Sequence, residues 1–332
     1  MTHEWTDWQG NDSQWDELIA GLGQQNVYQT ARWAKHKTAS GWSVSRIVIN
    51  GSQPQAAIQF LIRRFPLGLV MAWAPGGFSG DISLINTDLK STLKRLLQAR
   101  FLYIRFGMMR EELDNETPWI TRAGFKQSAH AIGARQSMLL PLSEKEDELI
   151  FRASSNWKRN YKRSLRLQTI PYVWHSPDST ELAQAYEKMD AYKKIKGVKL
   201  EISPQTFDSV RLNFGNDLVL IRIDDENGDL LSVRGALIQA QTAWDFIAVT
   251  SPEGRKNYAS HRVLISLAQE CARRGCTVLE MGGIDPEKNK GVFDFKNGTG
   301  ARAITYIGEW EASHPSWLRP IISRVISAKG NN

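Results

Sequence analysis

The order of apolar and polar residues over 1–143 predicts a mixed α/β unit. Leucines recur at helical spacing across 87–100, which indicates an amphipathic helix. Two apolar runs, 44–50 and 56–64, flank the turn signal Asn50-Gly51, so we expect a hairpin there. Similar patterns predict helices at 15–22, 30–40 and 119–123, and strands at 70–73, 101–106 and 137–141.

The segment 144–311 repeats this order. Acidic residues at 144–148 favour the first turn of a helix, because the helix dipole stabilises negative charge there. Each half places helices before an antiparallel meander, a helix and a further strand, so we predict two structurally similar domains, 1–143 and 144–311. The predicted helices of the second half are 154–166, 179–194, 204–213 and 258–274, and its strands are 172–175, 218–224, 232–240, 242–249, 278–281 and 305–310.

The C-terminal segment 312–332 has the pattern of an amphipathic helix. Apolar Trp317, Ile321 and Val325 are interspersed with Arg319 and Arg324. Such a helix either packs back on the protein or lies on a membrane. We expect it to pack on the first domain.

Composition narrows the class of protein. The net charge of +7 suits an anionic partner, such as a phosphate-bearing substrate, nucleic acid or an acidic membrane face. Cys271 and Cys276 have no CxxC motif or histidine cluster nearby, so we expect neither a zinc site nor a disulfide. No apolar run reaches membrane-spanning length, and the N-terminus lacks the pattern of a signal peptide. These features favour a cytoplasmic protein, with peripheral contact to the inner membrane face as a further option.

Two segments of the second half could bind an anionic acyl donor. Residues 250–260 connect a predicted strand to a predicted helix and carry Arg255, Lys256 and Tyr258. Backbone N–H groups at such a turn favour anions, and the spacing resembles the pyrophosphate loop of GNAT acetyltransferases. The glycines that this loop prefers are reduced to Gly254, and a solvated basic turn is the alternative interpretation.

The second segment follows the strand 278–281. Gly282 and Gly283 allow positive φ and the close approach of a ligand. Phe295 and Lys296 come shortly after. A lysine on a packed segment can stabilise an oxyanion or bind a phosphate, although most single lysines do neither.

The helix 154–166 is strongly basic. Trp157 and Tyr161 share one face at i, i+4 spacing, so the cations lie on the others. This face could contact RNA phosphates or an acidic surface, and a plain solvated face is the alternative. Its basic residues are Lys158, Arg159, Lys162, Arg163 and Arg166.

Motifs for covalent or metal-dependent catalysis are missing from the sequence. There is no G-x-S-x-G elbow, P-loop or metal-ligand motif, and the histidines do not cluster. The reaction that suits the remaining parts is direct attack of an amine on an activated ester, which requires positioning and charge stabilisation.

Together these segments resemble the FemABX family, the peptidyltransferases that add amino acids from aminoacyl-tRNA to peptidoglycan precursors. The resemblance implies two tandem GNAT-like domains in a mixed α+β fold, here without the coiled-coil arm of some members. It is carried by the segments 28–37 (YQTARWAKHK), 155–164 (SNWKRNYKRS), 282–284 (GGI), 291–300 (GVFDFKNGTG) and 306–310 (YIGEW).

The resemblance also implies residue roles. Lys37, with Lys35 as a close competitor, would grip the diphosphate of the precursor, and Lys194 would supply a second cation, where the family usually has arginine. Lys296 would lie at the acyl-transfer centre, shaped by Phe295. The substrate-binding set is completed by Tyr258, Arg255, Gly282 and Gly283, and the tRNA-contact set is Lys158, Arg159, Lys162 and Arg163.

The function that follows is an aminoacyltransferase that uses charged tRNA as donor and a nucleotide- or lipid-linked cell-wall precursor as acceptor. It would need no metal or organic cofactor. An acyl-CoA-dependent N-acyltransferase acting on a surface-polysaccharide or lipid-linked sugar is the second reading. A non-catalytic RNA- or membrane-binding scaffold is the third.

Overall fold

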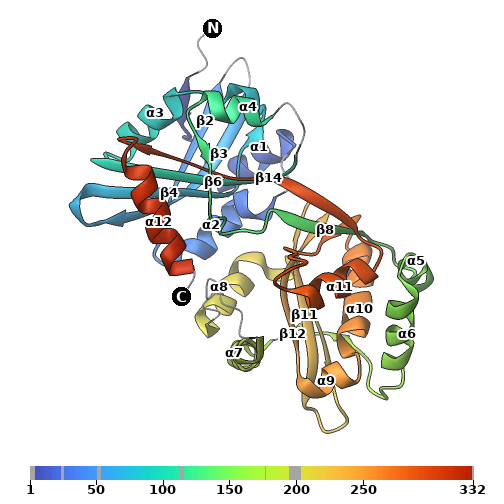
Figure 1. Cartoon of the computed structure of the whole chain (residues 1–332). Coiled ribbons are helices and arrows are strands. Elements are labelled where there is room, and N and C mark those ends of the chain that lie inside the picture. The colour runs from blue at the N-terminus through green and yellow to red at the C-terminus, as the bar shows by residue number, and fades with distance from the viewer. Residues whose placement is uncertain are drawn as a thin grey trace. The chain divides into compact units, whose positions relative to one another are not determined.

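The computed structural model describes residues 4–23, 26–50, 54–112, 116–175, 177–193 and 203–330. These residues form two compact units (Figure 1). The first combines the chain up to Arg135 with the segment from Thr305 onward, and the second covers Gln136 to Ile304 apart from 196–199.

The first unit is built on a sheet of order β1-β2-β3-β4-β6-β14. Neighbouring strands are antiparallel except for β4 and β6, which are parallel. The short strands β5 and β7 pair with β3 and β14. The bounds are β1 Trp5–Asp7, β2 Ser43–Asn50, β3 Pro54–Phe65, β4 Leu69–Gly76, β5 Ser79–Gly80, β6 Phe101–Glu111, β7 Lys126–Gln127 and β14 Arg302–His314.

Helices cover both faces of this sheet. Ile58, Leu102 and other alternate strand residues pack on one face against Leu89 and Leu93 of α3. On the opposite face Ala57 packs against α1 and α2, and α12 contacts β6. The bounds are α1 Asp12–Gly21, α2 Ala31–Thr38, α3 Asp88–Leu96, α4 Thr117–Arg122 and α12 Leu318–Gly330.

The second unit has a sheet of order β8-β13-β12-β11-β10-β9. Here β12 and β13 are the parallel pair, and the other neighbouring pairs are antiparallel. The bounds are β8 Gln136–Pro141, β9 Tyr172–Val173, β10 Leu218–Asp224, β11 Leu230–Gln239, β12 Thr242–Thr250 and β13 Val278–Glu280.

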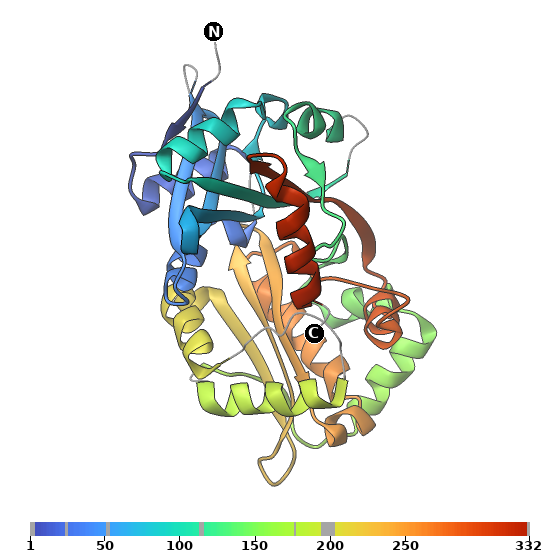
Figure 2. The ribbon, with the colours of Figure 1, turned by 60° about the vertical axis from the view of Figure 1, so that its left-hand side comes forward.

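Two groups of helices sandwich this second sheet (Figure 2). Leu264 and Leu267 of α10 pack with Trp157 of α6 on one face. On the other face Leu182 of α7 and Phe207 of α8 form a separate core. The bounds are α5 Glu146–Phe151, α6 Ser155–Ser164, α7 Ser179–Lys193, α8 Pro204–Phe214, α9 Pro252–Lys256, α10 Ala259–Arg273 and α11 Lys290–Gly298.

Local sequence signals explain most boundaries. Asn11 caps α1 and forms a capping box with Gln14, so the helix begins three residues before the expected start at 15. The predicted start of the helix 312–332 is wrong. The chain stays extended to His314 because β14 pairs with β6, and α12 begins only at Leu318. The segment around Lys296, expected only as an aromatic stretch, is helical, since Asn289 caps its first turn.

None of the helices in the described part of the chain is long and apolar enough to cross a bilayer. Cys271 and Cys276 are both free and buried. No group of three or more metal-ligating side chains occurs among the described residues.

The core of the second unit yields a stability prediction. Leu267 is fully buried on α10, whereas Leu212 on α8 is 84% exposed. We expect Leu267→Ala to lower the free energy of unfolding by about 2–5 kcal/mol, because it leaves a cavity. Leu212→Ala should change it by less than about 0.5 kcal/mol. Chemical denaturation measures both, and equal effects would contradict the assigned core.

Candidate active site

The second unit contains a point where two parallel strands separate. β12 and β13 pair at Thr242, Ala243 and Trp244, opposite Val278, Leu279 and Glu280. β13 then ends, while β12 continues to Thr250 along β11. Beyond Trp244 the edge of β12 is therefore released from its parallel neighbour, and this point of separation is the opening of the second sheet.

A β-bulge lies at the same point of β12. Ala236 pairs with Asp245 and Gly235 with Ile247, so Phe246 is the extra residue. Bulges re-aim side chains and are common beside active sites. Asp245, which stays paired with β11, is the first residue of β12 beyond its pairing with β13.

Lys296 on α11 places its ammonium at this opening. Lys296 is only 7% exposed, and its Nζ donates to the carbonyl oxygens of Gly282 at 3.0 Å and Gly283 at 2.9 Å. Gly282 has φ +74°, and a Cβ there would meet Lys296 Nζ at 3.6 Å and Asp245 Oδ2 at 3.8 Å. The backbone at the end of β13 thus turns its carbonyls toward the cation.

Two carboxylates lie near the ammonium: Glu280 is buried and Asp245 is partly buried. Asp245 accepts both hydrogen bonds of a bidentate pair from Arg234, at 3.0 and 2.8 Å. Glu280 accepts from the backbone N–H of Gly282 at 3.1 Å and contacts the hydroxyl of Ser137. Burial raises the pKa of Asp245, against the lowering effects of Arg234 and Lys296.

Glu280 is shifted in the same direction. Burial is the main cause of its raised pKa; the charge of Asp245 adds to it, and Ser137 and Lys296 oppose it. The opening therefore holds a fixed cation beside carboxylates that bind protons more readily than exposed ones do. Such a set can stabilise a developing negative charge and can also accept a proton.

The parallel strands of the first unit stay together over most of their length. Its parallel pair, β4 and β6, is matched at every position from Leu69 opposite Phe101 to Gly76 opposite Met108. Beyond this pairing β6 runs on only from Met109 to Glu111, whereas β12 runs on from Asp245 to Thr250, so the longer separation of parallel strands lies in the second unit.

An aromatic cluster lies next to Lys296. The ring of Phe295 is 5.0 Å from His261 and 6.2 Å from Trp157, and His261 is 5.8 Å from Tyr258. The Tyr258 hydroxyl accepts a hydrogen bond from Arg163 at 2.9 Å. These contacts run without a break from the helix of Lys296 to the basic helix α6.

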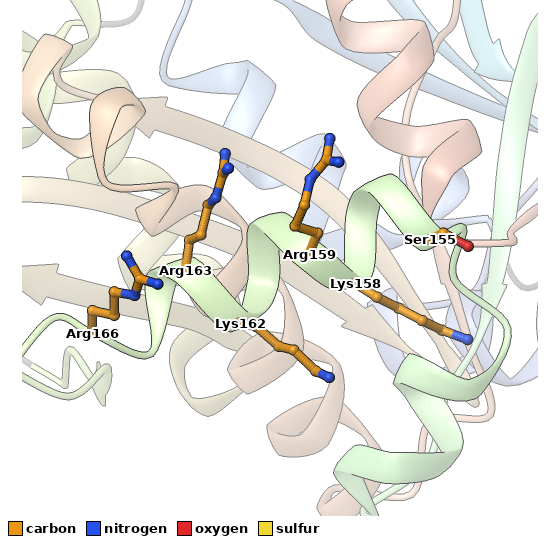
Figure 3. Close-up of a pocket in the computed structure, with 6 residues that line it drawn as sticks. All are labelled: Ser155, Lys158, Arg159, Lys162, Arg163 and Arg166. Atoms are coloured by element: carbon orange, nitrogen blue, oxygen red, sulfur yellow. The ribbon is translucent and has the colours of Figure 1, made fainter.

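The basic face of α6 lines an open pocket of about 560 Å³ (Figure 3). Trp157 and Tyr161, predicted to share one face of the helix, are buried and stacked at 5.9 Å, so they anchor the helix. Arg159 and Arg163 extend from one side and Lys158 and Lys162 from another. The residues that line the pocket are Ser155, Lys158, Arg159, Lys162, Arg163 and Arg166.

The connection between β12 and α10 differs from the expected loop. It contains the short helix α9, and Arg255 is exposed on it. A Cβ at Gly254 would come within 2.1 Å of the Leu231 carbonyl oxygen, so this glycine is required for packing against β11. Tyr258 adopts the left-handed conformation, φ 57°, directly before α10.

The remaining predicted cations lie elsewhere. In the first unit, Lys35 is exposed and forms an ion pair with Asp12 at 3.0 Å. Lys37 is half-buried with its Nζ 4.8 Å from the Trp33 ring centre, and burial lowers its pKa. Lys194 lies outside the described residues.

Sequence reasoning missed part of the buried cluster. Arg234, Asp245, Glu280 and Ser137 lie on four different strands and belong to no local motif. The available signal was a set of charged residues within strands that are otherwise apolar, such as Asp245 in TAWDFIAVT. Buried charges in such positions are expected only when they are paired.

Comparison with known proteins bears on the fold. Residues 177–316 match the model of the FemAB family. The crystal structure of FemX superposes with a TM-score of 0.80 at 16% identity, covering 96% of this chain and 100% of that one. The resemblance to the FemABX family is confirmed.

Two further structures resemble this FemABX-like chain. A tandem GNAT protein from the clavulanic acid biosynthesis pathway has a TM-score of 0.55 at 11% identity, covering 93% of this chain and 98% of its own. L-PGS from Bacillus licheniformis has a TM-score of 0.54 at 12% identity, covering 97% and 98%. The search of curated sequences found no match.

These comparisons confirm the predicted fold class. The FemABX-like chain has a mixed α/β fold of two tandem GNAT-like domains, and its described residues contain no coiled-coil arm. The family match also supports transferase activity, with aminoacyl transfer as the reaction at the level of the family.

His261 leads to a pH prediction. Burial lowers its pKa to about 4, and its Nδ1 has no hydrogen-bond partner. The unfolded chain therefore binds more protons between its ordinary pKa of 6.5 and about 4. The free energy of unfolding should therefore keep the full contribution of His261 above about pH 6.5, and it should decrease as the pH falls from 6.5 to about 4.

The test compares the wild type with His261→Phe. On going from about pH 7 to about pH 4, we expect the wild type to lose about 3 kcal/mol more unfolding free energy than the variant. Urea denaturation at both pH values measures the difference. Parallel losses in the two proteins would refute the assignment.

Proposed function

We propose that this protein is a non-ribosomal aminoacyltransferase that moves an amino acid from aminoacyl-tRNA to the amino group of a peptidoglycan precursor. The observation that carries the proposal is the buried ammonium of Lys296 where β12 and β13 separate. The FemAB family match supports the reaction class.

The donor would bind along the second unit. The cations of α6 would hold tRNA phosphates, because such contacts are electrostatic and need no base-specific geometry. Arg163 joins this face to Tyr258, and the aromatic contacts continue to Phe295. In this arrangement the aminoacyl ester of the tRNA reaches Lys296, with Gly282 and Gly283 beside it.

The chemical step is aminolysis of an ester. The acceptor nitrogen attacks the carbonyl carbon, a C–N bond forms, and the C–O bond to the tRNA ribose breaks. The amine loses one proton, and the released ribose oxygen gains one. Lys296 would stabilise the charge on the ester oxygen, and the carboxylates of Asp245 and Glu280, with their raised pKa values, would accept the proton.

The acceptor would use the first unit. Lys37 suits a diphosphate better than Lys35 does. Lys37 has no carboxylate partner among the described residues, whereas Asp12 neutralises Lys35. Lys194 and Arg255 remain proposed substrate contacts.

One incubation tests the main proposal. Purified protein is mixed with charged tRNAs and with nucleotide- and lipid-linked cell-wall precursors, and mass spectrometry follows the precursors. We expect the mass of one amino acid residue to be added, and ribonuclease pretreatment to abolish the addition. Turnover that survives ribonuclease would contradict the tRNA donor.

An acyl-CoA-dependent N-acyltransferase is the second candidate. The separated parallel strands, the bulge at Phe246 and the adjoining helix α10 form an arrangement that could also take the pyrophosphate of coenzyme A. Labelled acetyl-CoA distinguishes the two donors. Saturable binding and transfer to a sugar amine would favour this candidate over the first.

Lys296→Met tests the catalytic role. We expect kcat to fall by about 10²–10³-fold with little change in KM, because the charge acts mainly in the transition state. Lys288→Met, in the exposed loop before α11, is the matched control and should keep full activity. Lys296→Arg restores a cation if the methionine variant folds poorly. Full activity of a folded Lys296→Met protein would exclude the role.

Lys162→Ala tests the tRNA surface. Lys162 is exposed and lines the pocket on α6. We expect weaker tRNA binding. The slope of log K against log salt should become less steep by about 0.7–0.9 if one phosphate contact is lost. An unchanged slope would indicate that this face is only solvated.

A further inference from the structure

The outer side of α12 carries an apolar stripe that the protein leaves uncovered. Trp317 directly precedes α12, and Ile321 and Val325 follow it at i+4 and i+8. Their side chains are 58%, 51% and 52% exposed. Leu318 and Ile322 on the neighbouring side are only partly exposed. The helix, seen beside the first sheet in Figure 1, therefore packs with one side on β6, whereas Ile321 and Val325 on another side stay exposed.

The turn between β3 and β4 exposes further apolar side chains in the same unit. Leu67 is 84% exposed and Phe65 is 42% exposed. Leu67 also has a φ of 63°, a conformation that is unfavourable for a leucine. The fold thus holds a large apolar side chain at the tip of a turn, although it packs against almost nothing there.

The turn and the helix meet at one end of the first sheet. Phe65 pairs with Leu69, and Leu69 pairs with Phe101 on the next strand. Paired residues point to the same face of a sheet, so these side chains lie in a row. The Phe101 ring is 6.3 Å from the ring of Trp317. Turn, strand ends and helix therefore form one continuous surface.

Positive charge surrounds this surface without compensation. Arg63 donates to the Ser40 carbonyl and Arg64 to the Leu97 carbonyl, while Arg100 lies over the ring of Phe101. These arginines and Arg324 form no ion pair with any described residue. The three segments that build the surface, 54–80, 89–110 and 312–330, contain no aspartate or glutamate.

We propose that this surface docks the protein peripherally on a bilayer that contains anionic lipids. The docking surface consists of the apolar residues Phe65, Leu67, Trp317, Ile321 and Val325 with the flanking Arg63, Arg100 and Arg324. Contiguous exposed apolar residues mark an interaction site. A tryptophan beside aliphatic side chains, ringed by arginines that have no acidic neighbour, matches the boundary between anionic headgroups and acyl chains.

Vesicle co-sedimentation of the full chain tests this proposal without any substrate, so its outcome is independent of the proposed transferase activity. We expect binding to phosphatidylcholine vesicles that contain phosphatidylglycerol, weak binding to phosphatidylcholine alone, and release by salt. The double variant Leu67→Ser, Trp317→Ser should bind at least ~10-fold more weakly, because it removes two inserting side chains.

Matched controls separate this surface from others. Leu212→Ser and Phe151→Ser change side chains of the second unit that are 84% and 81% exposed, and should bind vesicles like the wild type. Arg324→Glu keeps every apolar residue and should also weaken binding, which keeps the test valid if the double variant folds poorly.

Several results would overturn the proposal. These are equal binding to neutral and anionic vesicles, undiminished binding by the folded double variant, or loss of binding on Lys162→Glu in α6 alone. A concentration-dependent dimer in analytical ultracentrifugation that the double variant abolishes would also overturn it, since the surface would then be an interface between copies.

Discussion

The separation of β12 from β13 is the constraint on which the second unit depends. Once the strands part, the sheet loses its backbone pairing on one edge, and buried polar groups there need other partners. Lys296 supplies one by donating to the carbonyls of Gly282 and Gly283. A buried charge is costly unless it is paired. The same requirement explains why Asp245, Arg234 and Glu280 lie together in this cluster.

The two units show how one topology can serve different purposes. In the first, β4 and β6 stay paired along their shared length, and Arg105 on β6 forms a buried ion pair with Glu309 on β14. Its charges cross-link two adjacent strands, and Arg319 extends the network to α12 by pairing with Glu311. In the second unit the charges lie at the separation of β12 and β13 instead. This position suits a catalytic role better than the cross-linking of strands.

The positive charge of the chain is likewise divided between surfaces of different character. On α6 the aromatic residues are buried and the pocket is lined by cations and Ser155, which suits a hydrated polyanion. On the docking surface the aromatic and aliphatic side chains are exposed among the cations, which suits a partner with both charge and apolar depth. Burial of the aromatic residues, rather than net charge, distinguishes the two surfaces.

Much of the architecture could be read from the sequence, because apolar periodicity, capping residues and turn signals act over a few neighbouring residues. They predicted the meanders, the long helices and the shared face of Trp157 and Tyr161. They also singled out Lys296 and the glycines at 282 and 283. The helical state of 290–298 was missed because two glycines mask its pattern and the cap at Asn289 is its main local signal.

Only the tertiary structure decided which of these residues meet. The carboxylates of Asp245 and Glu280 lie on different strands, and a β-bulge sets the orientation of the first. A register shift of one residue leaves no trace in the apolar periodicity of the sequence. The proposed preference for Lys37 over Lys35 rests on the ion pair of Lys35 with Asp12, a residue of another helix. The face of the last helix that stays uncovered was likewise set by its packing on β6. Local physics determined the elements of this protein, whereas long-range pairing determined where its charges are buried and where its apolar residues are exposed.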